Sequence, residues 1–219
     1  MFETGNVTPM SIMDIVNKQD NSIYYIVKDL APDVRKAGRA AVKAWGVKSR
    51  FIHFEFFRLT QDQAGLGKKG DVVALEVNMR PCGGFTPDMI NFAHSTNVYK
   101  IWADMIAFDH SETTVGDHVF CAFAGRRDGK NFALSDAQLL EKYYPAIRLV
   151  ERIPDALADA MGNRMYVAVF PTLAKLEAFY RDALAEAKPA PAKKAAAKKA
   201  TAKKATAKKP ASKAAKAEK

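Results

Sequence analysis

Two segments decide the fold, Phe51-Ile-His-Phe-Glu-Phe-Phe-Arg-Leu59 and Asp71-Val-Val-Ala-Leu-Glu-Val-Asn-Met-Arg80. Both are rich in aromatic or β-branched residues, which predicts a β-strand over each of them. The polar stretch between them contains Gly65, Gly67 and Gly70 and predicts a long loop. We therefore expect an antiparallel β-hairpin with a long tip.

The polar residues of this hairpin have the spacing of a shared face. Side chains two residues apart project from the same side of a strand, so Glu76, Asn78 and Arg80 project together, and Glu55 shares a side with His53. If Glu55 pairs near Glu76, two carboxylates and a carboxamide oxygen converge, and Mg²⁺ prefers such ligands. Arg80 would add a donor for phosphate or carboxylate oxygens. The alternative is a solvated polar face of an amphipathic edge strand.

These residues also suggest a family. Glu55 in an aromatic strand, followed by Glu76-x-Asn78-x-Arg80-Pro81 and then Gly83-Gly84, closely resembles the magnesium–nucleotide strands of ATP-grasp enzymes such as biotin carboxylase and the carbamoyl phosphate synthase large chain. The resemblance covers roughly residues 1–108. It implies the C-terminal half of an ATP-grasp domain and an ATP-dependent ligase that joins a carboxylate to an amine, or to a related nucleophile, through an acyl-phosphate.

The resemblance also implies roles for individual residues. Glu55 would hold one Mg²⁺, Glu76 would bridge two, and Asn78 would bind the second. Arg80 would bind the phosphate and act as the catalytic residue that steadies the acyl-phosphate. The implied cofactors are ATP and two Mg²⁺ ions, with Mn²⁺ as a substitute, and the implied substrates are a small carboxylate and a small amine.

The chain departs from the ATP-grasp pattern upstream of the hairpin. About 50 residues precede Glu55, well below a domain of about 100–150 residues, so the lobe that would bind the nucleotide is not expected within the chain. Three explanations stay open: a truncated gene product, a partner polypeptide that supplies the first half, or a remnant that does not catalyse. Exposed apolar surface is expected where the absent lobe would pack.

The rest of the chain predicts an α+β protein in three parts: an ATP-grasp C-terminal half over 1–108, a small α/β subdomain over 109–187, and a disordered Lys/Ala-rich tail over 188–219. A helix over about 33–45 ends at Gly46, and a second begins at an N-cap Thr86 and carries an apolar face from Val98 to Ile106. Trp45 and Trp102 are expected in the core. The later elements are strands over 119–124, 147–153 and 165–170 and helices over 135–144 and 173–187.

The charge of the chain is concentrated in the tail. Residues 188–219 contain twelve lysines and one glutamate, a net of +11, so the chain's total of +10 leaves residues 1–187 at −1. The tail resembles the C-terminal tails of linker histones and bacterial histone-like proteins. This predicts non-specific binding of nucleic acid through its lysine pairs, with a solubilising extension as the alternative. The paired lysines are Lys193, Lys194, Lys198, Lys199, Lys203, Lys204, Lys208 and Lys209.

Two cysteines, Cys82 and Cys121, are too few for a disulfide framework or a cysteine-rich zinc site. The sequence has no secretory pattern at its start and no apolar stretch of membrane-spanning length. The expected location is therefore the cytoplasm, with nucleoid association as an extension of the tail hypothesis, and no membrane partner is expected.

Overall fold

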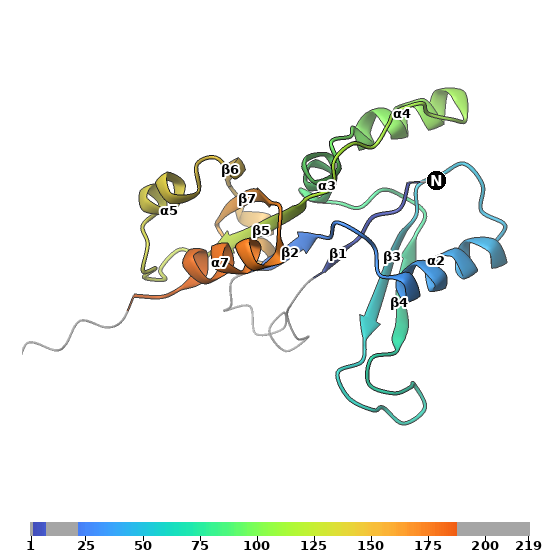
Figure 1. Ribbon diagram of the computed structural model, residues 1–219, viewed down its shortest axis with the longest axis horizontal. Coiled ribbons are helices and arrows are strands. Elements are labelled where there is room, and N and C mark those ends of the chain that lie inside the picture. The colour runs from blue at the N-terminus through green and yellow to red at the C-terminus, as the bar shows by residue number, and fades with distance from the viewer. Residues whose placement is uncertain (1, 8–21, 188–219) are drawn as a thin grey trace, which may run out of the picture. The chain divides into compact units, whose positions relative to one another are not determined.

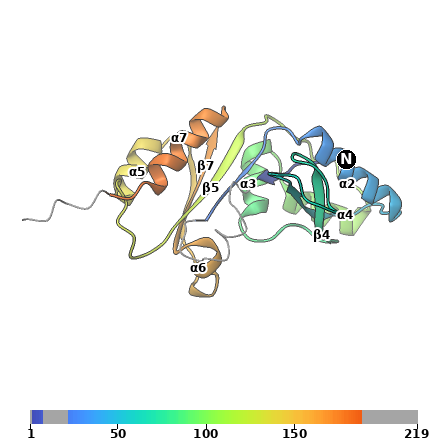
Figure 2. The same cartoon turned by 90° about the horizontal axis from the view of Figure 1, so that it is seen from below.

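The computed structural model describes residues 2–7 and 22–187. The described residues belong to one compact unit, and residues 188–219 lie outside the described range. The predicted disordered tail and its eight paired lysines therefore lie outside the described residues. The elements, labelled in Figure 1 except for α6, which Figure 2 labels, are β1 (Asn6–Val7), β2 (Ile23–Ile26), α2 (Pro32–Ala44), β3 (His53–Arg58), β4 (Val72–Asn78), α3 (Thr86–His94), α4 (Val98–Phe108), β5 (Phe120–Arg126), α5 (Asp136–Tyr143), β6 (Ile147–Arg152), α6 (Asp155–Met161), β7 (Arg164–Phe170) and α7 (Leu173–Leu184).

A five-stranded antiparallel sheet, in the order β1-β2-β5-β7-β6, carries the core. Alternate side chains of β5 enter two different clusters, because successive residues of a strand point to opposite faces. Phe123 packs with residues of α3 on one face, while Ala122 and Ala124 pack with residues of α7 on the other. Both faces of the central strands are therefore covered by helices, which explains the nearly continuous apolar sequence of β5 and β7 (Figure 2).

The hairpin forms a separate two-stranded sheet from β3 and β4, as the sequence predicts. A β-bulge interrupts its register after Glu55, so Leu75 has no partner in the ladder. The helix α2 lies against this hairpin, and it ends next to Gly46, whose φ of +59° favours glycine. The mixed α+β class with an antiparallel sheet and flanking helices is confirmed.

The helical region after the hairpin differs from the prediction in three ways. Phe85, not Thr86, is the N-cap, and Thr86 is the first helical residue. The single expected helix is two helices, because Ser95 adopts a left-handed conformation with φ 45° and ends α3. The expectation that both tryptophans are core residues is wrong: Trp102 on α4 is 48% exposed and Trp45 is 52% exposed.

Side-chain caps mark the starts of two helices in the second half of the chain. Ser135 and Gln138 form a capping box at the start of α5, and the Thr172 hydroxyl accepts a hydrogen bond from the Lys175 backbone N–H at the start of α7. Three elements, β1, β2 and the short helix α6, were not predicted from the sequence. Because β2 pairs with β5, the predicted segments 1–108 and 109–187 share one sheet and one core, and the boundary between them stays a prediction.

Neither cysteine is in a disulfide, since Cys82 and Cys121 are both free thiols. Cys121, on β5, is fully buried in the core cluster that also holds residues of β2 and α3. Among the described helices, none is both long and apolar enough to cross a membrane.

Gly125 is the position where the sheet tolerates no side chain. A Cβ built on Gly125 would lie 1.9 Å from the backbone oxygen of Met161, at the end of α6. Because a backbone carbonyl cannot move aside as the end of a flexible side chain can, any larger residue forces β5 and the α6–β7 turn apart.

We predict that Gly125→Ala lowers the free energy of unfolding by about 1–3 kcal/mol or more, the usual effect of overpacking a core. Gly38→Ala is the matched control, because its Cβ would meet only the Phe54 ring at 3.8 Å in ordinary contact. That change should be neutral or stabilise α2 by roughly 0.5–1 kcal/mol. Urea unfolding curves of the two variants test this, and equal stability of both would contradict it.

His94 is a titratable group inside the core. It is 2% exposed, its Nε2 is hydrogen-bonded to the Thr4 hydroxyl at 2.6 Å, and its ring contacts Phe2 and His118 edge-on. Burial, together with the neighbouring His118, lowers the pKa of His94 to about 4. The native state therefore holds this ring neutral at pH values where the unfolded chain protonates it.

The consequence is acid sensitivity in a defined range. Between about pH 6.5 and 4 the unfolded state binds a proton at His94 that the native state does not, so stability rises with pH across this window and falls on acidification. The contribution is at most about 3 kcal/mol. Unfolding measured from pH 7 to 4 should show a shallower pH dependence for His94→Phe than for His110→Phe, a change at an exposed histidine. Parallel curves for the two variants would contradict the assignment.

Candidate functional site

The register of the hairpin brings the predicted acidic residues together. Glu55 lies directly opposite Glu76, and His53 lies directly opposite Asn78. Residues directly opposite each other in an antiparallel pair project to the same face with Cβ atoms about 4.5–5.5 Å apart. The structure thus places all four side chains on one face of the hairpin.

The opposite face of the hairpin is packed, and this determines which face is exposed. Phe54 and Val77 form the next cross-strand pair, and they project away from the acidic face. The Trp45 ring stacks on Phe54 at a centroid distance of 6.0 Å, and Gly38 of α2 lies under the same ring. A slip of one residue would expose these apolar groups, so burial against α2 holds the carboxylates on the outer face.

Each carboxylate has one polar neighbour on this face. The Asn78 Nδ2 donates a hydrogen bond to the Glu76 Oε1 at 2.6 Å, and the His53 Nε2 lies 4.0 Å from the Glu55 Oε1. The Glu55 side chain is 44% exposed, and Glu76 is also exposed. Like charges placed directly opposite repel. A hard cation between the two carboxylates would relieve this repulsion, and their oxygens are the ligands it prefers.

The donor set fits a magnesium ion only with help from other ligands. Among the described residues, no group of three or more His, Cys, Asp or Glu side chains is arranged to hold a metal. The protein could offer the carboxylates of Glu55 and Glu76 and the Asn78 Oδ1, which the amide's bond to Glu76 through Nδ2 leaves available. Mg²⁺ commonly binds one or two carboxylates and completes its shell with water and phosphate oxygens.

Arg80 lies two residues beyond the end of β4, and no hydrogen bond joins it to Glu55, Glu76 or Asn78 among the described residues. It follows β4, and its Nη1 donates to the backbone oxygen of its neighbour Pro81 at 2.9 Å. The guanidinium is exposed, so it has the freedom to meet a phosphate or carboxylate group that binds at the acidic face.

His53 is the residue of this face to which the sequence analysis assigned no role. Its Nδ1 is buried without a hydrogen-bond partner among the described residues, while its Nε2 points toward Glu55. The only sequence signal for its placement is its position two residues before Glu55, because side chains two residues apart on a strand project to the same face.

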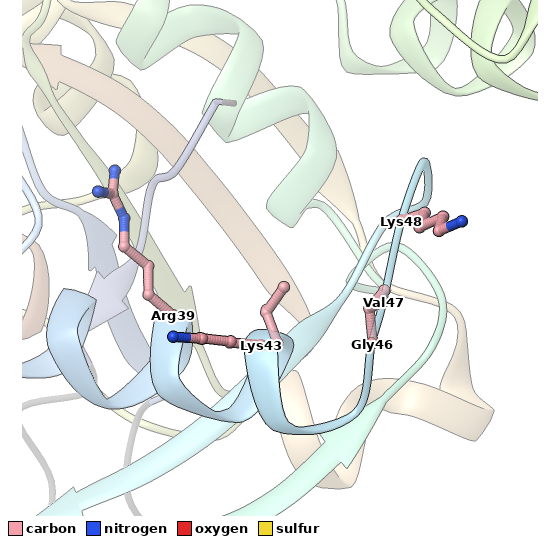
Figure 3. Close-up of a pocket in the computed structure, with 6 residues that line it drawn as sticks. Arg39, Lys43, Gly46, Val47 and Lys48 are labelled. Atoms are coloured by element: carbon pink, nitrogen blue, oxygen red, sulfur yellow. The ribbon is translucent and has the colours of Figure 1, made fainter.

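A surface hollow of about 560 Å³ lies beside the end of α2, but its charged side chains do not point toward a common ligand position (Figure 3). It is lined by Arg39, Val42, Lys43, Gly46, Val47 and Lys48. The side chains of Lys43 and Lys48 extend in opposite directions (Figure 3), and Arg39 is committed to a two-bond ion pair with Glu3 at 2.7 and 2.9 Å. We assign this hollow no function.

Comparison with known proteins supports the fold. No protein-family model matches the sequence, and a search of curated proteins found no match. Among solved structures, the crystal structure of an L-amino acid ligase from Bacillus licheniformis is similar to this chain with a TM-score of 0.51 and 17% sequence identity. The match covers 73% of this chain and 43% of the ligase chain. At this identity the likeness concerns the arrangement of helices and strands alone.

Proposed function

We propose that this chain is the C-terminal half of an ATP-grasp-type ligase, which binds magnesium and ATP phosphates at the acidic face of the hairpin. The reaction class is the ATP-dependent joining of a small carboxylate to an amine or a related nucleophile through an acyl-phosphate. ATP and two Mg²⁺ ions are the proposed cofactors. The observation that carries this proposal is the pairing of Glu55 directly opposite Glu76, with Asn78 beside them.

The proposed roles follow from the chemistry of phosphoryl transfer. Bound Mg²⁺ would neutralise charge on the phosphate oxygens and act as a Lewis acid there. Glu55 and Glu76 supply the negative charge that holds the metal, Asn78 adds a neutral oxygen, and Arg80 binds the transferred phosphate and the acyl-phosphate. Arg80 suits this role because its planar guanidinium pairs with two oxygens at once and stays protonated at every physiological pH.

A partner polypeptide that supplies the nucleotide-binding lobe is part of the proposal. The chain spans 43% of the length of the similar ligase structure, and α4 carries large exposed apolar side chains: Trp102 is 48% exposed, Phe108 66% and Ile106 77%. An apolar helix face of this kind is typical of a surface that another element covers. The alternative is a remnant that binds magnesium weakly or not at all and does not catalyse.

The test is binding of a paramagnetic substitute for magnesium. Mn²⁺ titrated into the full chain, followed by the enhancement of water proton relaxation, should show saturable binding. Glu76→Gln should weaken this binding at least about ten-fold, because a charge-assisted contact contributes about 1.5–3 kcal/mol. Addition of ATP should tighten Mn²⁺ binding to the unsubstituted chain, since phosphate oxygens complete the metal's shell.

Glu151→Gln is the matched control, because Glu151 is an exposed glutamate of β6 outside the hairpin. It should leave Mn²⁺ binding unchanged. Without metal, Glu76→Gln should not lower the urea midpoint, since it removes a like-charge repulsion across the strands. Equal Mn²⁺ affinity of the two variants would refute the proposed site.

A second candidate function belongs to residues 188–219, and the observation that favours it is the net charge of +11 in this segment. The proposed activity is non-specific binding of nucleic acid through phosphate contacts. The tail has no aromatic residue for base stacking, so only electrostatic attraction to the backbone is available. A solubilising role for the tail remains the alternative.

Replacement of the eight paired lysines by glutamine should abolish retention of duplex DNA at low salt. For the unsubstituted chain, a plot of the logarithm of the binding constant against the logarithm of salt concentration should have a slope of roughly −0.9 for each phosphate neutralised. Replacement of all eight lysines should therefore reduce the magnitude of this slope by up to about 7. Fluorescence anisotropy at several salt concentrations measures this. An unchanged slope would show that the DNA contacts lie elsewhere.

A further inference from the structure

Three arginines lie side by side across three neighbouring strands. In the register of the main sheet, Arg126 of β5 pairs with Arg164 of β7, and Arg164 pairs with Arg152 of β6. Residues paired in this way project to the same face, with adjacent side chains within contact distance. A row of three like charges is unfavourable unless anionic groups compensate it.

The chain's own carboxylates compensate this row only in part. Asp136, at the start of α5, accepts a hydrogen bond from the Arg126 Nη1 at 2.9 Å and forms an ion pair with the Arg164 Nη1 at 3.1 Å. Asp128 forms a two-bond ion pair with Arg152, and this arginine holds the pKa of the Asp128 carboxyl below its usual range. Two carboxylates therefore compensate the charge of three guanidinium groups.

The row lines a pocket of about 310 Å³ that adds further positive charge. Its lining holds five cationic side chains against two carboxylates, and one of the five, Lys130, is paired at 3.1 Å with Glu186, which lies outside the lining. The lining residues belong to the loop between β5 and α5 and to the adjoining ends of β5, β6, β7 and α5, elements that Figure 1 labels. The lining residues are Arg126, Arg127, Asp128, Gly129, Lys130, Phe132, Asp136, Arg152 and Arg164. None of them belongs to the hairpin, so this pocket is separate from the proposed magnesium site.

Arg126 gives the pocket a rigid, buried wall. The residue is 3% exposed, its guanidinium lies 4.4 Å from the centre of the Phe132 ring, and its Nε donates to the Ala183 backbone oxygen at 2.7 Å. Its Nη1 donates to Leu134 and Asp136, but its Nη2 is buried without a hydrogen-bond partner among the described residues. A buried charged group with an unsatisfied donor is costly, and an acceptor in the pocket would satisfy it.

We propose that this pocket binds the phosphate group of a small phosphorylated molecule, with Arg126, Arg152 and Arg164 as its ligands. Phosphate carries a charge of about −1.5 to −2 at pH 7 and presents three strong acceptor oxygens, and guanidinium forks match its geometry. A monocarboxylate would leave more of the excess positive charge uncompensated. The volume of about 310 Å³ exceeds that of one phosphate ion, which favours a phosphate ester.

The test uses inorganic phosphate as the first probe and a readout at the pocket itself. Backbone amide resonances of Asp128 and Gly129 in the ¹⁵N-labelled full chain should shift saturably during a phosphate titration at constant ionic strength, with sodium chloride as the exchanged salt. Phosphate that binds the lysine tail or Arg80 does not move these two amides. If the ligand is a phosphate ester, glycerol 3-phosphate should saturate the same shifts at a lower concentration than inorganic phosphate does. Saturation by both compounds at the same concentration would indicate that the ligand is free phosphate.

The variants separate binding from stability. Arg164→Gln should weaken phosphate binding roughly ten-fold or more, since one charge-assisted contact is lost, while Asp136 keeps its bond to Arg126. Arg164→Lys keeps the positive charge but loses the two-pronged guanidinium, so it should bind phosphate with intermediate affinity. This variant tests the proposal even if Arg164→Gln does not fold. The control is Arg148→Gln, because Arg148 is an exposed arginine of β6 that donates only to nearby backbone oxygens and does not line the pocket. Its phosphate affinity should be unchanged.

Three results would overturn the proposal: shifts that do not saturate, equal phosphate affinity of the Arg164→Gln and Arg148→Gln variants, or tighter binding of malonate than of either phosphate probe. The last result would assign the pocket to a dicarboxylate.

Discussion

Repulsion between like charges held in register across β-strands is the physical constraint on which the two candidate sites depend. In the hairpin two carboxylates face each other at Glu55 and Glu76, and in the main sheet three guanidinium groups follow one another at Arg126, Arg164 and Arg152. A ladder cannot relieve such contacts by sliding, since a shift of one residue would turn the buried side of each strand outward. The repulsion therefore has to be met by counter-charges, from the chain or from a ligand.

The apolar layers behind these two rows explain why the chain can hold them. The acidic face of the hairpin is the reverse of a face that packs on α2 through Phe54 and Trp45. The arginine row lies at the end of strands whose inner residues are enclosed between α3 on one side and α7 on the other. Packed elements of this kind hold charged side chains in nearly fixed positions, so binding a counter-ion requires little reordering.

The likeness to an amino acid ligase concerns the arrangement of helices and strands, and fold alone does not establish an activity. Both proposals rest on local features instead: carboxylate and amide oxygens on one face of the hairpin and guanidinium groups in one row of the main sheet. The two sites differ in charge and use different elements, so an experiment that refutes one of them does not refute the other. Residues 1–187 are close to neutral overall, and these local concentrations of charge arise from strand pairing rather than from composition.

Signals carried by neighbouring residues were enough to predict much of this protein from its sequence. The hairpin, the end of α2 at Gly46 and the shared side of Glu76 and Asn78 all depend on residues a few positions apart, where φ/ψ preferences and side-chain alternation act directly. The tertiary structure alone decided that β2 pairs with β5, that α4 leaves Trp102 exposed, and that arginines from three strands form one row. These features depend on contacts between segments far apart in the chain, and no local preference encodes which strands will meet or which faces will be covered.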